Sequence, residues 1–156
     1  MRPSLRTLLG TSAAILLFLS TATARDVAVV VNKSNGTKNV TLAELTKLVK
    51  GTTKKWADAR EVTLVIKDPA ASDMKTVVQK VFGMTPDEVK TLIATLNGAR
   101  KDSVLIVPSD DVLVKTVQTT PGAVGFVDVY SINSGISVVK IDNKSPLEPG
   151  YALHGQ

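Results

Sequence analysis

Apolar residues along the chain follow two patterns, short β-branched runs and stretches spaced like one face of a helix. Residues 26–31 are almost continuously apolar, which is typical of a strand buried on both faces, and polar residues at 32–39 end this run. The same reasoning predicts further strands at residues 61–66, 104–107, 122–127 and 136–141.

Local end signals mark the helices between these strands. Thr41 and Glu44 form a capping-box pattern, in which each side chain accepts a hydrogen bond from the other residue's backbone N–H, and Gly51 ends this helix. Similar signals predict a helix that Thr85 caps and Gly98 ends, a helix that Ser72 or Asp73 caps, and a helix from the cap Ser109 to about Gln118.

The predicted elements alternate along the chain, in the order strand, helix, strand, two helices, strand, helix and two strands. Alternation of this kind favours parallel pairing, because a crossover helix brings the chain back to the edge of the sheet at which it started. The sequence therefore predicts an α/β fold with a largely parallel sheet of about five strands and helices on both faces.

The first 24 residues have the pattern of a secretory signal peptide. Arg2 and Arg6 lead into an uncharged run at 7–19, which the small residues at 22–24 follow. The alternative is a membrane anchor, but spanning a bilayer takes about 20 apolar residues and the run at 8–19 is shorter. We expect cleavage before Arg25, leaving one domain at 25–156 without a membrane anchor.

Composition limits the classes of protein to which the chain could belong. Hydrophobic residues make up 44% and charged residues 21% of the 156 residues, as in a soluble globular protein. Loss of Arg2 and Arg6 with the signal peptide lowers the 19 basic side chains to 17 against 14 acidic ones, a net charge of +3. Such mild charge, with 4% aromatic residues, argues against a nucleic-acid partner.

The sequence offers few groups for catalysis. With no Cys, the chain has no disulfide, no thiolate metal site and no lipidated cysteine. His154 is the only histidine and lies near the end of the sequence, and phosphate-loop and dinucleotide motifs are absent. Asp110 and Asp111 fall at a predicted helix start, where negative charge complements the helix dipole. We predict a non-enzymatic protein without a cofactor or metal.

One junction stands out as a candidate anion site. Residues 67–73 connect a predicted strand end to a helix N-terminus, where free backbone N–H groups and the helix dipole attract negative charge. Lys67, Ser72 and Asp73 are therefore the candidate ligand-binding residues. The alternative is an ordinary capped turn, which every strand-to-helix connection contains.

The order of several segments resembles a known family. Residues 29–35, residues 41–45 with Gly51 and Trp56, residues 65–68 and the sequence TPGAVGFV at 120–127 are similar to phosphate-type substrate-binding proteins of ATP-binding cassette (ABC) importers. This resemblance covers nearly the whole mature chain. It implies one lobe of a type II periplasmic binding protein, located in the bacterial periplasm.

The family pattern departs from this sequence at the candidate anion site. Where the family carries Ser-Gly-Thr followed by Arg, the present chain has residues 71–74, Ala-Ser-Asp-Met. The resemblance implies a solute-binding domain for phosphate or another oxyanion, associated with the membrane subunits of an ABC transporter. The lost guanidinium and the added Asp73 favour the alternative, an accessory or protein-interaction module that has lost ligand capture and pairs with a second copy of itself.

Export with cleavage after Ala24 is directly testable. Mass spectrometry of the periplasmic protein should find Arg25 at its N-terminus, because the small residues at 22–24 fit a signal-peptidase site. An intact Met1 in a membrane fraction would contradict this prediction.

Overall fold

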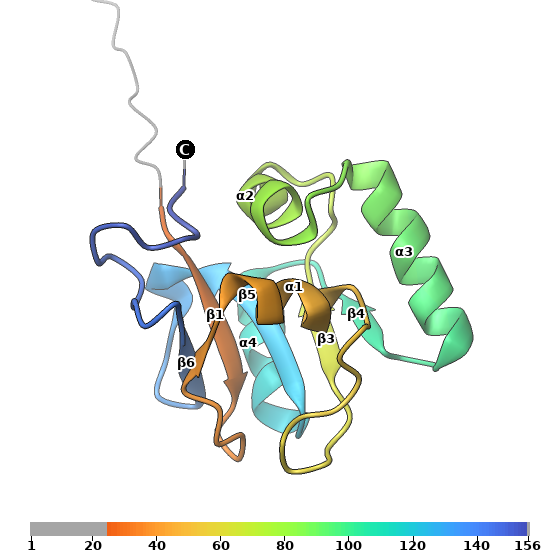
Figure 1. The fold of residues 1–156 in the computed structure, drawn as a ribbon, viewed down its shortest axis with the longest axis horizontal. Coiled ribbons are helices and arrows are strands. Elements are labelled where there is room, and N and C mark those ends of the chain that lie inside the picture. Colours follow the sequence, from red (N-terminus) through yellow and green to blue (C-terminus); the bar gives the residue numbers. More distant parts are fainter. Residues whose placement is uncertain (1–24, 156) are drawn as a thin grey trace, which may run out of the picture.

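Six strands form one mixed sheet in the part of the chain that the structure, a computed structural model, describes, residues 25–155 (Figure 1). Their order across the sheet is β2-β6-β1-β5-β3-β4. The strands are β1 (Val27–Asn32), β2 (Asn39–Val40), β3 (Thr63–Ile66), β4 (Val104–Ile106), β5 (Ala123–Asp128) and β6 (Ile136–Ile141). β3 runs parallel to β4 and β5, and β2 runs parallel to β6, whereas β1 is antiparallel to both of its neighbours.

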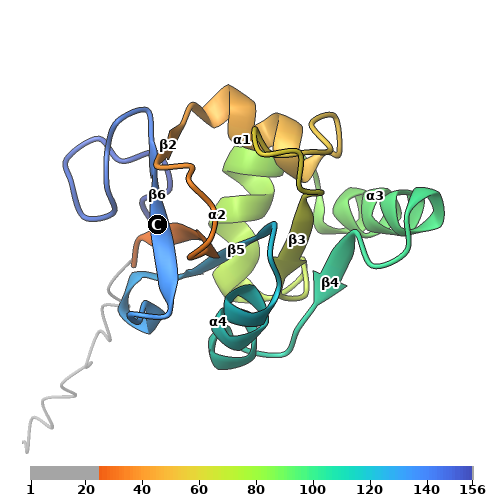
Figure 2. The ribbon, with the colours of Figure 1, turned by 90° about the horizontal axis from the view of Figure 1, so that it is seen from below.

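Helices cover both faces of this sheet, so the predicted α/β class is confirmed (Figure 2). α1 (Leu42–Val49) and α3 (Pro86–Ala99) pack on one face, together with the irregular helical segment at 72–82. α4 (Asp110–Thr119) packs on the opposite face. Because side chains alternate along a strand, β1 contributes Val29 and Val31 to one core and Ala28 and Val30 to the other.

The three predicted caps at Thr41, Thr85 and Ser109 are confirmed. Thr85 Oγ1 accepts a hydrogen bond from the N–H of Glu88 at 3.2 Å, and Glu88 Oε2 accepts one from the N–H of Thr85 at 2.8 Å. Thr41 and Glu44 form the same capping box at the start of α1. These contacts join residues three positions apart, which is why the sequence alone identifies them.

The prediction that Ser72 or Asp73 caps a helix is wrong. The segment consists of η1 (Ser72–Met74), α2 (Lys75–Val77) and η2 (Val78–Phe82), which have 3-10, α and π geometry respectively. Ala71 holds the N-cap position, and no side chain caps it. The Asp73 carboxylate instead forms an ion pair with Lys67, and this contact replaces a local cap.

One further difference concerns the sheet. The short strand β2 was not predicted, because its two residues lie within the stretch that links β1 to α1. The predicted signal peptide at residues 1–24 lies outside the described residues. Within residues 25–155, no helix is both long enough and apolar enough to span a membrane.

The cap of α3 should contribute measurably to stability. Replacing Thr85 by Ala leaves the N–H of Glu88 without its acceptor, so we expect the free energy of unfolding to fall by about 0.5–2 kcal/mol. Urea unfolding followed by circular dichroism measures this change.

Thr95→Ala is the matched control for this cap. The Thr95 hydroxyl is exposed in the middle of α3 and donates to the carbonyl oxygen of Thr91. Alanine favours a helix interior, so this change should stay within about 0.5 kcal/mol. Equal losses in the two variants would contradict a specific capping role.

Candidate functional site

Charged side chains gather at the edge of the sheet where β3, β4 and β5 end. These three strands are parallel, so their carboxyl ends share an edge, and β1 begins there because it is antiparallel to β5. Open α/β sheets bind ligands at such an edge. A cavity of about 390 Å³ lies here, and its lining includes Arg25, Lys67, Ser72, Asp73, Lys75, Lys80, Asp110 and Asp128.

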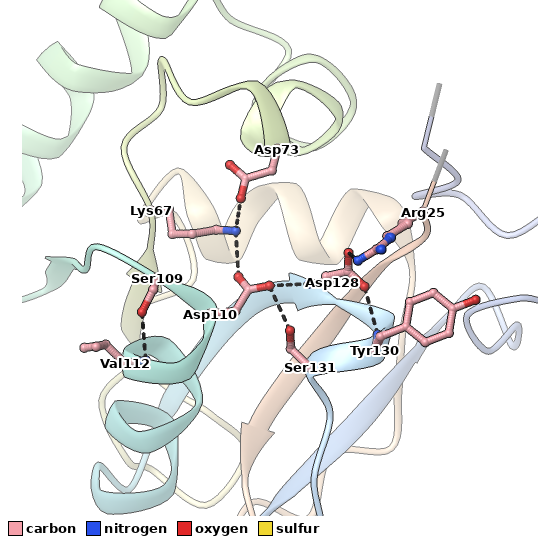
Figure 3. Close-up of polar contacts among 9 residues, drawn as sticks. All are labelled: Arg25, Lys67, Asp73, Ser109, Asp110, Val112, Asp128, Tyr130 and Ser131. Atoms are coloured by element: carbon pink, nitrogen blue, oxygen red, sulfur yellow. Dashed lines mark hydrogen bonds and ion pairs between the residues drawn. The ribbon is translucent and has the colours of Figure 1, made fainter. Parts of the chain in front are cut away.

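Lys67 is the central side chain of this cavity, and Figure 3 shows its ammonium between Asp73 and Asp110. Nζ lies 2.6 Å from Asp110 Oδ1 and forms a second ion pair with Asp73 Oδ2. Only 9% of the Lys67 side chain is exposed. The ammonium is therefore nearly shut off from water and is matched by two carboxylates.

These surroundings raise the pKa of Lys67 above its ordinary value. Burial alone lowers this pKa, but the hydrogen bonds and negative charges of Asp110 and Asp73 together outweigh it. Lys67 therefore stays charged at neutral pH. The charged Lys67 stabilises the folded state fully at any pH below the pKa of a lysine in the unfolded chain. This stabilisation is lost as the pH rises through the raised pKa of Lys67 in the folded state.

Asp110 connects three elements at this edge. Its Oδ1 faces Lys67, and its Oδ2 accepts hydrogen bonds from the N–H of Asp128 at 3.1 Å and the hydroxyl of Ser131 at 3.0 Å (Figure 3). The cap of α4 is Ser109, whose Oγ accepts from the N–H of Val112. The sequence indicated only that Asp110 complements the helix dipole. Its main contacts are with Lys67, Asp128 and Ser131, which are distant in the sequence.

The three predicted binding residues lie together in the cavity. Lys67 and Asp73 form an ion pair, and Ser72 lines the same cavity. The Asp73 side chain is 55% exposed, so it covers Lys67 from the solvent side. Met74, which the resemblance aligns with the family's Arg, is almost completely buried in the core. Met74 also borders the cavity, where its thioether cannot supply the charge of a guanidinium.

The other charges around the cavity are balanced in sign. The lining includes the bases Arg25, Lys67, Lys75 and Lys80 and the acids Asp26, Asp73, Asp110 and Asp128. Arg25 Nη1 lies 3.1 Å from Asp128 Oδ2, and its guanidinium lies 5.3 Å from the ring centroid of Tyr130. The cavity as a whole therefore carries no strong excess of positive charge.

A second polar cluster, which the sequence did not indicate, fastens the C-terminal segment to the start of β1. The buried carboxylate of Asp26 accepts a hydrogen bond from the N–H of Leu147 at 2.6 Å and lies 2.5 Å from His154 Nδ1. The Tyr151 hydroxyl donates to the carbonyl oxygen of Val27 at 2.8 Å. Burial, assisted by the charge of Asp26, raises the pKa of Tyr151 well above its usual range. His154 is therefore held by Asp26.

Comparison with known families gives one clear match. A family model described as "PBP superfamily domain" matches residues 17–152. A comparison with curated proteins found no match.

Within residues 25–155, no group of three or more His, Asp or Glu side chains is placed to hold a metal ion.

Several solved structures have a fold similar to that of this chain. An ABC-type phosphate transport receptor from Vibrio cholerae is 18% identical, with a TM-score of 0.61, and the match covers 78% of this chain and 48% of the receptor. PstS from Borrelia burgdorferi is 12% identical, with a TM-score of 0.62 and coverage of 85% and 55%. A phosphate-binding protein from Stenotrophomonas maltophilia is 16% identical, with a TM-score of 0.60 and coverage of 79% and 40%.

These likenesses concern the fold, because the identities are low. The chain spans about half the length of the structures that it matches. The Vibrio cholerae structure is described as a receptor and the Stenotrophomonas maltophilia structure as a binding protein.

The two carboxylates that face Lys67 should differ in their contribution to stability. Asp110→Asn removes a mostly buried charge that faces the ammonium, so we expect the free energy of unfolding to fall by about 1.5–3 kcal/mol. Asp73→Asn removes a half-exposed partner and should cost less than about 1 kcal/mol. Urea unfolding of both variants at pH 7 measures the difference. If Asp73→Asn is the more destabilising variant, Asp110 is not the main partner of Lys67.

Proposed function

The chain belongs to the PBP superfamily, and from this premise we propose that it is an accessory solute-binding-protein-like domain of an ABC importer in the periplasm. In this proposal, residues 1–24 are a cleaved signal peptide and residues 25–156 are one domain. The domain associates with transporter subunits but does not capture phosphate at Lys67. The likeness to an ABC-type phosphate transport receptor supports the setting, and the geometry around Lys67 supports the lack of capture.

The double pairing of Lys67 is the observation that carries this proposal. Asp110 and Asp73 already neutralise its ammonium, so an incoming oxyanion gains little from it. A phosphate approaching from solvent would first have to displace Asp73, which carries the same sign of charge. Asp110 would remain close behind the ammonium, held by Asp128 and Ser131.

Oxyanion binding in the same cavity is the second candidate function. The exposure of the Asp73 side chain favours it, because an exposed carboxylate can rotate away from Lys67 into water. Ser72 and Lys75 line the cavity and would then supply a hydroxyl donor and a further positive charge. In this candidate Lys67, Ser72 and Lys75 bind the anion, and Asp73 acts as a competing internal anion.

A phosphate titration separates the two candidates. Isothermal calorimetry at low ionic strength should detect weak or no binding to the unmodified protein, because Asp73 neutralises Lys67 from the solvent side. Asp73→Asn should strengthen binding by roughly tenfold or more, since a charge-assisted hydrogen bond contributes about 1.5–3 kcal/mol. Sulfate and molybdate should show the same order between the two proteins.

Asp111→Asn is the control for a simple change in net charge. Asp111 is an exposed carboxylate in the first turn of α4 and does not line the cavity. Its replacement should leave phosphate binding unchanged. Micromolar phosphate affinity in the unmodified protein would overturn the accessory role and favour the second candidate. Equal weak binding in all three proteins would show that Asp73 is not the barrier.

A further inference from the structure

A cavity of about 320 Å³ lies at the end of the sheet opposite to the candidate site. Its lining includes Val62 and Leu64, around the start of β3, and Ser103 and Val104, around the start of β4. The candidate site lies where the same two strands end. Ligand pockets in proteins have volumes of about 300–1,000 Å³, so this cavity is large enough for a small organic molecule.

The ends of α1 and α3 form the other sides of this cavity. Figures 1 and 2 show the two helices lying apart from each other. Leu48 and Val49 come from the last turn of α1, and Leu96 and Ala99 come from the last turn of α3. The Leu96 side chain reaches Gly51, just after α1, and occupies the space that a Cβ there would need. Glycine at this position therefore lets Leu96 form part of the cavity wall.

The inner wall of the cavity is apolar. It consists of buried members of the core that α1 and α3 cover, together with one partly buried leucine: Leu48, Val49, Val62, Leu64, Val104 and Leu96. An apolar wall favours a ligand with an apolar body, because binding removes the apolar surface of both partners from water.

The rim of the cavity carries positive charge that the chain itself does not neutralise. Lys54 and Lys55 line the cavity, are exposed, and form no ion pair within residues 25–155. Arg100 is already paired, because its Nη1 lies 3.3 Å from Glu61 Oε2 and its Nη2 donates to the carbonyl oxygen of Val62. The lining thus has three bases against one acid, a net charge of +2.

We propose that this cavity binds a small amphipathic organic anion, a molecule with an apolar body and one carboxylate. The apolar body lies against the inner wall, and the carboxylate lies at the rim near Lys54 and Lys55. An inorganic oxyanion would leave the apolar wall without a partner, and a neutral hydrocarbon would leave the two lysines without one. The proposal does not rest on the function proposed above, because this cavity shares no lining residue with the cavity at Lys67.

Isothermal calorimetry with sodium octanoate as the probe tests this site. We expect saturable binding with a dissociation constant at or below about 1 mM, the weak end of specific association. Hexanoate, which is two methylenes shorter, should bind about 15-fold more weakly, because each buried methylene contributes about fourfold. Octanamide has the same chain length without the charge, so it should bind about tenfold more weakly than octanoate.

A substitution that fills the cavity locates the binding. Ala99 is exposed at the end of α3 and lines the cavity, so Ala99→Phe should weaken octanoate binding at least tenfold. Ala94→Phe is the matched control, because Ala94 is exposed in the same helix but lies outside the cavity. Both positions are exposed, so the unfolding midpoints of the two variants should stay close to that of the unmodified protein.

Removal of the two lysines tests the role of the rim charge. Lys54→Gln combined with Lys55→Gln should weaken octanoate binding about tenfold and leave octanamide binding unchanged. Lys33→Gln combined with Lys115→Gln removes the same charge from exposed lysines outside the cavity, so octanoate should bind this variant as it binds the unmodified protein.

Three results would overturn the proposal. The first is no saturable octanoate binding up to about 10 mM, tenfold above the weak end of specific association. The second is equal octanoate affinity in Ala99→Phe and Ala94→Phe, and the third is equal affinity in the two lysine variants. Asp73→Asn, which alters the cavity at Lys67, should leave octanoate binding unchanged whatever its effect on phosphate. A failure of this proposal is therefore distinguishable from a failure of the proposed function.

Discussion

A nearly buried ammonium constrains the edge of the sheet where the candidate site lies. Removing the Lys67 charge from water is unfavourable unless opposite charges lie close to it, and Asp110 and Asp73 meet that condition from two different helical segments. Asp110 in turn accepts hydrogen bonds from Asp128 and Ser131. The end of β3, the start of α4 and the end of β5 thus depend on one charge. The same pairing leaves little free positive charge for an oxyanion.

Much of the fold follows from local features of the sequence. The caps at Thr41, Thr85 and Ser109 involve donors three residues further along, so residue type and spacing are sufficient to identify them. The continuous apolar run of β1 indicates burial on both faces. That pattern is the same for parallel and antiparallel strands, which is why the sequence did not reveal that β1 is antiparallel to β5 and β6.

The candidate site was predictable only in part. Lys67, Ser72 and Asp73 were found because they lie in one strand-to-helix connection. Asp110 was not, because it comes from a different connection and its local context already explains an acidic residue. The pairing of Asp26 with His154 joins residues 128 positions apart, and no short motif encodes it. For Asp73 the local signal favoured a cap. Its carboxylate instead pairs with Lys67, which lies 6 residues earlier in the chain.

The place of β1 in the sheet has a consequence for the order of folding. The strand nearest the N-terminus lies between β5 and β6, and the Asp26 cluster then binds residues of the C-terminal segment. Such non-local pairing delays folding, because a long loop must close before any contact compensates for its lost entropy. During synthesis the central strand has no partner until the last third of the chain has been made. The topology therefore postpones the completion of the central part of the sheet until the residues of β5 and β6 are available.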